Sequence, residues 1–134
     1  LPDLLPLLDV ACPMLYPSHF YSPFLGMDRP SDYPYYLVQE GILRLAPLAE
    51  AHGVDVRPWL QAFPYGVKGF DAQYVTEQIH ATRDAGGNGW MLWNSASRFD
   101  VALEAMRRLR EGQAVAAPNR QPESPGSQSE KPDM

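Results

Sequence analysis

The chain has 134 residues, with 11 lysines and arginines against 16 aspartates and glutamates, and therefore a net charge of −5. This length predicts one domain. The acidic balance argues against a nucleic-acid-binding protein, which would present a clustered basic face. No apolar run reaches the ~18 residues of a membrane span. The single cysteine, Cys12, excludes an internal disulfide and leaves the compartment undetermined, export included.

The composition of the chain changes after Gly112. Residues 113–134 consist mainly of proline, serine, glutamine and charged residues, without an aromatic side chain. Such a segment cannot bury enough apolar surface to offset the entropy lost on ordering. We therefore predict a folded part over residues 1–112 and a disordered tail over residues 113–134. The start at Leu1-Pro2, without a methionine, indicates a processed or truncated product.

The folded part begins with a predicted strand over residues 9–16, followed by a long loop rich in proline and aromatic residues. A helix is predicted over residues 37–49, because its apolar residues recur at helical spacing. Gly53 ends this helix, and Pro47 is expected to kink it or divide it in two.

The second predicted strand covers residues 54–63, and the third covers residues 89–94. Between them, Asp71 is the expected N-cap of a helix that ends at Gly86-Gly87. The predicted buried face of this helix consists of Tyr74, Val75, Gln78, Ile79 and Thr82. After the third strand, a capping box from Ser97 to Asp100 begins a helix. Its predicted buried stripe consists of Phe99, Ala102, Leu103, Met106 and Leu109.

Strands and helices thus alternate three times, which is typical of parallel strands joined by crossover helices. The predicted fold class is α/β. Pro13 and Pro58 each remove a donor from the ladder and occupy the same place in successive strands, so we expect a local bulge at both.

Three similar triplets mark the ends of the predicted strands: residues 14–16, 59–61 and 91–93. Side chains alternate along a strand, so a shared register directs the central residues Leu15, Leu60 and Leu92 toward the helices. The opposite face then carries Met14, Tyr16, Trp59, Gln61, Met91 and Trp93, with Cys12 and Arg57 two residues earlier.

This opposite face is rich in hydrogen-bonding groups, unlike the Val- and Ile-rich face that a second helical layer covers. It suits the upper lumen of a barrel, where strand ends and loops build a site. The alternative is that Trp59 and Trp93 merely fill a core.

Four segments in this order resemble a known family: PMLYPSHF (13–20), RPWLQAF (57–63), QIHATRDAG (78–86) and GWMLWN (89–94). The family is a glycoside hydrolase domain of bacteria and archaea, first catalogued as a domain of unknown function and assigned to the TIM-barrel glycosidases. The resemblance covers about residues 9–99. The resemblance implies that the chain comprises the last three βα units of a (β/α)₈ barrel. A whole barrel needs about 250 residues, so the chain is expected to be the carboxy-terminal portion of one.

Most glycoside hydrolases need two carboxyl groups that flank the scissile bond, and no acidic residue lies on the predicted lumen face. Asp9 and Asp55 lie at strand beginnings, Asp71 and Asp100 are predicted caps, and Asp28 and Asp32 lie in the long loop, within possible reach of the site. We expect the catalytic pair on strands that precede residue 1. The chain alone is then inactive.

The remaining chemistry predicts a carbohydrate-binding wall, since sugars stack on aromatic rings and their hydroxyls form hydrogen bonds. The predicted substrate-binding residues are Met14, Tyr16, His19, Arg57, Trp59, Gln61, Trp93 and Asn94. Two alternatives stay open: Asn94 as a turn residue and His19 as a structural histidine. The three scattered histidines show no metal-ligand spacing, and no cofactor is predicted.

Two other functions compete with a fragment of a carbohydrate-active enzyme. One is a non-catalytic carbohydrate-binding or assembly module that uses the same aromatic wall. The other is a small doubly wound nucleotide-binding domain, which the lack of a glycine-rich turn after any strand disfavours.

Overall fold

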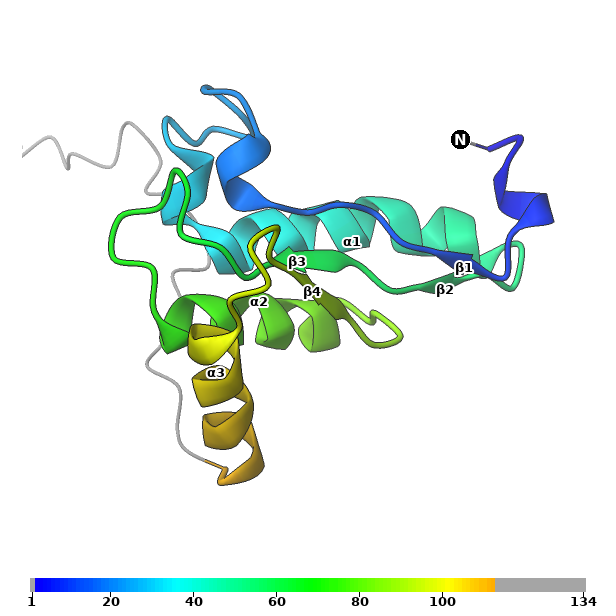
Figure 1. Ribbon diagram of the computed structural model, residues 1–134. Helices are drawn as coiled ribbons and strands as arrows, with labels where there is room; N and C mark the ends of the chain where they lie inside the picture. The colour runs from blue at the N-terminus through cyan, green and yellow to red at the C-terminus, as the bar shows by residue number, and fades with distance from the viewer. Residues whose placement is uncertain (1, 113–134) are drawn as a thin grey trace, which may run out of the picture.

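The computed structural model describes residues 2–112, so the predicted disordered tail lies outside the described residues. Four short strands and three α-helices alternate along this part of the chain (Figure 1). The strands are β1 (Val10–Ala11), β2 (Asp55–Val56), β3 (Trp59–Gln61) and β4 (Met91–Trp93). The α-helices are α1 (Pro34–Glu50), α2 (Ala72–Asp84) and α3 (Asp100–Arg110). The 3₁₀ helices are η1 (Leu5–Leu7), η2 (Pro17–His19) and η3 (Pro30–Asp32). The α/β class is confirmed.

The strands form two small parallel sheets, β1–β2 and β3–β4, instead of the predicted single sheet of three continuous strands. The second predicted strand is divided into β2 and β3 at Arg57-Pro58, and the first is reduced to β1 and a single bridge at Met14. The breaks coincide with Pro58 and Pro13, which have no N–H to donate to a ladder.

Backbone hydrogen bonds nevertheless connect the two sheets. The Trp59 N–H donates to the Pro13 carbonyl at 2.9 Å, and the Leu15 N–H donates to the Trp59 carbonyl at 3.0 Å. On the other side, the Met91 N–H donates to the Pro58 carbonyl at 2.9 Å. The chain around β3 therefore lies between the first segment and β4, with all three running in parallel.

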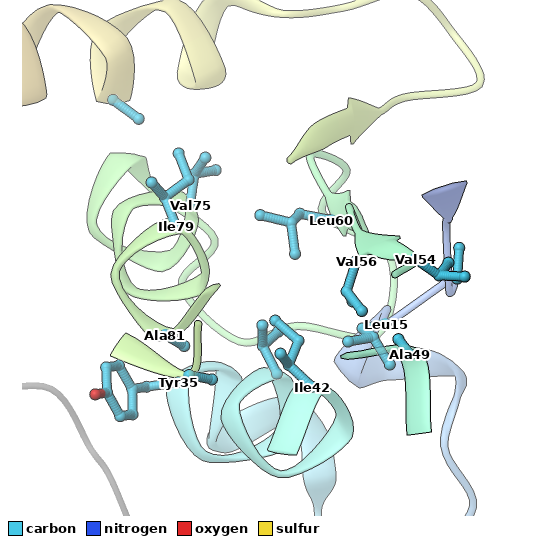
Figure 2. Packing of buried hydrophobic residues seen from close by; sticks show 14 of the residues in the cluster. Leu15, Tyr35, Ile42, Ala49, Val54, Val56, Leu60, Val75, Ile79 and Ala81 are labelled. Atoms are coloured by element: carbon cyan, nitrogen blue, oxygen red, sulfur yellow. The ribbon is translucent and has the colours of Figure 1, made fainter. Parts of the chain in front are cut away.

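The hydrophobic core lies between these strands and the helices. Leu15 and Leu60 are buried, and Leu92 is partly buried against the same cluster. Figure 2 shows Leu60 directed toward Val75 and Ile79 of α2. The helices α1 and α2 contact each other and pack on the same side of the strands (Figure 1). This arrangement leaves the other face of the strands without a helix among the described residues.

Helix α1 continues through Pro47 to Glu50, so Pro47 does not divide the helix in two, and the alternative of a kink at Pro47 stays a prediction. Val38 and Ile42 are buried, as the apolar spacing predicts. Gly53 follows the helix at φ +66°, a conformation that favours glycine at this position.

Helix α2 agrees with its sequence pattern. Asp71 is its N-cap, accepting the Tyr74 N–H at 3.0 Å, and Gly86 follows the helix at φ +85°. All five predicted buried residues, Tyr74, Val75, Gln78, Ile79 and Thr82, are buried.

Helix α3 departs from its predicted start and stripe. Phe99, not Ser97, occupies the N-cap position, and Asp100 is the first helical residue without a side-chain cap. The buried residues are Ala102 and Ala105, whereas Leu103 is 66% exposed and Phe99 is also exposed. The rest of the predicted stripe is confirmed, because Ala102 is buried and Met106 and Leu109 are partly buried against the core cluster. Helix α3 packs against α2. None of the described helices is long and apolar enough to cross a membrane.

Candidate functional site

The three triplets share a register, as predicted. Trp59 pairs with Met91, Leu60 with Leu92 and Gln61 with Trp93, while Met14 forms a bridge with Trp59. Since Leu15 and Leu60 enter the core and side chains alternate along a strand, the residues on either side of each leucine face away from the helices.

Two tryptophans meet on this face. The Trp59 and Trp93 ring centroids lie 5.9 Å apart at an interplanar angle of 86°, an edge-to-face pair. Trp93 is 47% exposed and Met14 is 68% exposed, while Trp59 is half-buried. Trp93 therefore does not fill a core in the described structure. Met14, Trp59 and Trp93 are called the tryptophan surface below.

A second group of rings lies at the ends of the first strand segment and β3. The Tyr16 ring centroid lies 5.3 Å from His19 and 5.4 Å from Phe63, and His19 lies 5.5 Å from Phe63. Tyr16 is buried and His19 is exposed. Burial raises the pKa of the Tyr16 hydroxyl above its ordinary value, so this hydroxyl is protonated at neutral pH. Tyr16, His19 and Phe63 are called the ring cluster below.

Gln61, predicted to bind a sugar, is fully buried, and its side chain bonds to main-chain groups. Its Oε1 accepts the Ser18 N–H at 3.1 Å. Its Nε2 donates to the Phe63 carbonyl at 3.0 Å and to the Tyr65 carbonyl at 3.2 Å. Gln61 thus holds the loop after the first strand against the loop after β3.

Asn94 adopts the turn role that the sequence left open. Its Nδ2 donates to the Ala62 carbonyl at 2.8 Å, and its Oδ1 accepts the N–H groups of Ala96 at 2.9 Å and Arg98 at 3.2 Å. The Arg57 Nε donates to the Asn88 carbonyl at 3.1 Å, in the turn before β4. The side chains of both residues are therefore engaged by neighbouring backbone.

Three residues that the sequence interpretation did not assign to the candidate site contact residues that it did assign. Phe63 completes the ring cluster, and Tyr65, in the same loop, is 74% exposed. Gln78 of α2 bonds to the backbone of Gln61. The sequence contained a pattern that could have indicated Phe63 and Gln78. Phe63 follows Gln61 by two residues, a spacing that puts both on the same side of an extended chain. Gln78 lies in a predicted buried helical stripe, where a glutamine needs hydrogen-bonding partners.

Two cavities lie apart from the tryptophan surface and share no residue with it. One, of about 400 Å³, lies between the end of α1, the start of β2 and the turn at Asn88. The other, of about 240 Å³, lies between η3 and the start of α2 and includes Glu77. Burial raises the pKa of Glu77, against the opposing effect of its hydrogen bond with Gln73. Among residues 2–112, no group of three or more His, Cys, Asp or Glu side chains could hold a metal ion.

The loop after the first strand and the loop after β3 contact each other where Gly66 approaches Ser18. This contact gives a testable prediction. Gly66 has φ +71°, and a Cβ atom added there would lie 2.9 Å from the Ser18 Cβ. We expect Gly66→Ala to lower the free energy of unfolding by about 2 kcal/mol, through left-handed strain and overpacking. Chemical denaturation followed by circular dichroism measures this loss.

Gly69→Ala is the matched control, because Gly69 has φ +64° in the same loop and nothing lies within 4 Å of an added Cβ. It carries the backbone strain without the collision, so its loss should be about half as large. Equal losses in the two variants would contradict the contact with Ser18.

Comparisons with known proteins place these features in context. Residues 1–99 match the model of a family described as "putative glycosyl hydrolase domain". No curated protein matches the chain. A solved structure of bee venom hyaluronidase is similar at a TM-score of 0.50 and 18% sequence identity, over 82% of this chain. The likeness covers 34% of the hyaluronidase, so the chain spans about a third of that enzyme's length.

Proposed function

The chain belongs to the glycosyl hydrolase domain family whose model it matches, and we propose that it supplies part of the glycan-binding wall of a glycoside hydrolase. The observation that carries the proposal is the edge-to-face pair of Trp59 and Trp93 on a strand face that no described helix covers. Sugar rings present apolar C–H faces, which pack on exposed aromatic rings, and binding sites combine such surfaces with a few polar groups.

In the proposed architecture, the described strands and helices are the last three βα units of a TIM barrel. The parallel register of the strand segments and the packing of α1 and α2 on one side support this placement. The likeness in fold to the hyaluronidase supports it as well. The tryptophan surface would then face the lumen at the carboxyl ends of the strands, where barrel enzymes bind their substrates.

The predicted site residues take different parts in this proposal. Met14, Trp59 and Trp93 form the stacking surface, and the exposed His19 of the ring cluster would supply a polar group. Gln61 and Asn94 act through the loops that they hold, since their side chains bond to main chain. Arg57 lies before β3, at the opposite end of that strand from Gln61, and its side chain bonds to the turn before β4.

The catalytic carboxylates are proposed to lie outside this chain. The strand register places Met14, Trp59, Gln61, Met91 and Trp93 on the face away from the helices, and none of these residues is acidic. A pair of carboxyl groups is what most glycosidic-bond hydrolysis requires. The same observation favours a second candidate function, a carbohydrate-binding module without catalysis.

The experiment compares this chain with a version extended upstream in its gene. Both are run in native gels containing hyaluronan, xylan or hydroxyethyl cellulose, and both are assayed for release of reducing sugar ends. We expect both proteins to be retarded by at least one polysaccharide and only the extended version to release sugar. Retardation without release in both favours the module, and no retardation of either protein refutes the proposed function.

A further inference from the structure

Two buried glutamines connect α2 to the end of β3. The Gln61 N–H donates to the Gln78 Oε1 at 2.8 Å, and the Gln78 Nε2 donates to the Gln61 carbonyl at 2.9 Å. The same Nε2 donates to the Tyr74 carbonyl at 3.2 Å, within α2. Both glutamines are fully buried. The Gln78 side chain thus pairs with the β3 backbone at Gln61.

The Gln61 side chain continues this chain of hydrogen bonds into two loops. It accepts from the Ser18 N–H of η2 and donates to the Phe63 and Tyr65 carbonyls of the loop after β3. The side chains of His19 and Tyr65 are exposed. Gln61 bonds to the carbonyl of Tyr65 itself and to the N–H of Ser18, the residue directly before His19. The close approach of Gly66 to Ser18 brings the same two loops together independently.

The chemistry of position 78 is demanding. The side chain must accept from one backbone group and donate to another, and a carboxamide does both at once. A methionine has nearly the same length but neither group, and it would leave the Gln61 N–H and carbonyl buried without partners. A buried donor or acceptor left without a partner destabilises the folded state, because its hydrogen bond with water in the unfolded chain is not replaced.

We propose that Gln78 is a positioning residue, which acts through Gln61 to fix the backbone from which the exposed side chains of His19 and Tyr65 project. This inference rests on the proposed glycan-binding function. Gln78 itself is fully buried, so a ligand on the protein surface cannot reach its side chain. Its role is to fix the backbone of Gln61, whose side chain in turn fixes the two loops.

The test is amide hydrogen exchange of the full chain by NMR, with Gln78→Met as the variant. We expect the Gln61 and Ser18 amides to exchange about tenfold faster or more, because local opening becomes easier when a buried hydrogen bond is lost. The Ser18 amide bonds to the Gln61 side chain and not to Gln78, so a role limited to local packing of α2 would not change it. Gln73→Met, on the same helix with its side chain bonded to Glu77, is the control and should leave the Ser18 amide unchanged.

The outcomes are distinguishable. Faster exchange at Gln61 with unchanged exchange at Ser18 overturns the proposal, and so does unchanged retardation of Gln78→Met in hyaluronan, xylan or hydroxyethyl cellulose gels that retard the wild type. If Gln78→Met does not fold, wild-type exchange at increasing urea decides: equal opening free energies for the two amides support the coupling, and different ones refute it. Failure of the wild type to bind any of the three polysaccharides refutes the proposed function, while the exchange data still decide whether the two glutamines act together.

Discussion

Leu60→Ala is expected to lower the free energy of unfolding by about 3 kcal/mol, within the range found for buried leucines truncated to alanine. Leu60 is fully buried at the centre of β3 and belongs to the core cluster. Figure 2 shows its side chain directed toward Val75 and Ile79 of α2, so the truncation removes contacts inside the core. Since small domains have total stabilities of about 5–15 kcal/mol, the loss is a large share of the total. Urea titration followed by circular dichroism gives the value.

Leu103→Ala is the matched control for this prediction. Leu103 is 66% exposed on α3, so its truncation removes little buried surface. We expect a change within about 0.5 kcal/mol in either direction. A loss at Leu103 as large as the loss at Leu60 would mean that α3 packs differently from the described structure.

The second large effect concerns ligand binding. Trp93→Ala should weaken binding to the polysaccharide that retards the wild-type chain most by about thirtyfold, the effect of losing a central aromatic contact worth about 2 kcal/mol. The ring is half exposed and forms the edge-to-face pair with Trp59, so its removal also frees the Trp59 ring to move. Affinity electrophoresis over a range of polysaccharide concentrations measures the change.

Tyr21→Ala controls for the loss of any exposed aromatic side chain. Tyr21 is 91% exposed and is not part of the tryptophan surface or the ring cluster. Its substitution should leave the polysaccharide affinity within about twofold of the wild type. If both variants lose affinity equally, binding depends on general aromatic exposure and the tryptophan surface is not the site.

The sequence was sufficient to predict the α/β class, the register of the strand ends and the buried face of α2. These features depend on periodicity, because a central leucine recurs in three triplets and side chains alternate along a strand, which permits one consistent alignment. The strand lengths were overestimated, since the apolar runs continue past Pro13 and Pro58 although each proline removes a donor. For α3, Ala102, Met106 and Leu109 of the predicted stripe are buried or partly buried against the core, whereas Phe99 and Leu103 are exposed and Ala105 is buried instead.

The polar part of the site was less predictable than the aromatic part. Gln61 and Asn94 were assigned to a ligand because they end their strands, yet both side chains bond to loop carbonyls and N–H groups. A strand end leaves backbone groups without ladder partners, and a nearby carboxamide is the simplest partner for them. Whether such a carboxamide binds a ligand or bonds to the loop backbone depends on the path of the loop. This path is set by contacts such as that of Gly66 with Ser18.

The alternation of core and surface residues within each triplet has a consequence for how such a domain evolves. Leu15 and Leu60 serve the helices, while Met14, Trp59 and Trp93 lie on the opposite face. Because the two sets occupy separate sides of the same backbone, substitutions on the outward face need not disturb the packing of the leucines. Selection can therefore diversify the outward residues among homologues while the leucines remain constant.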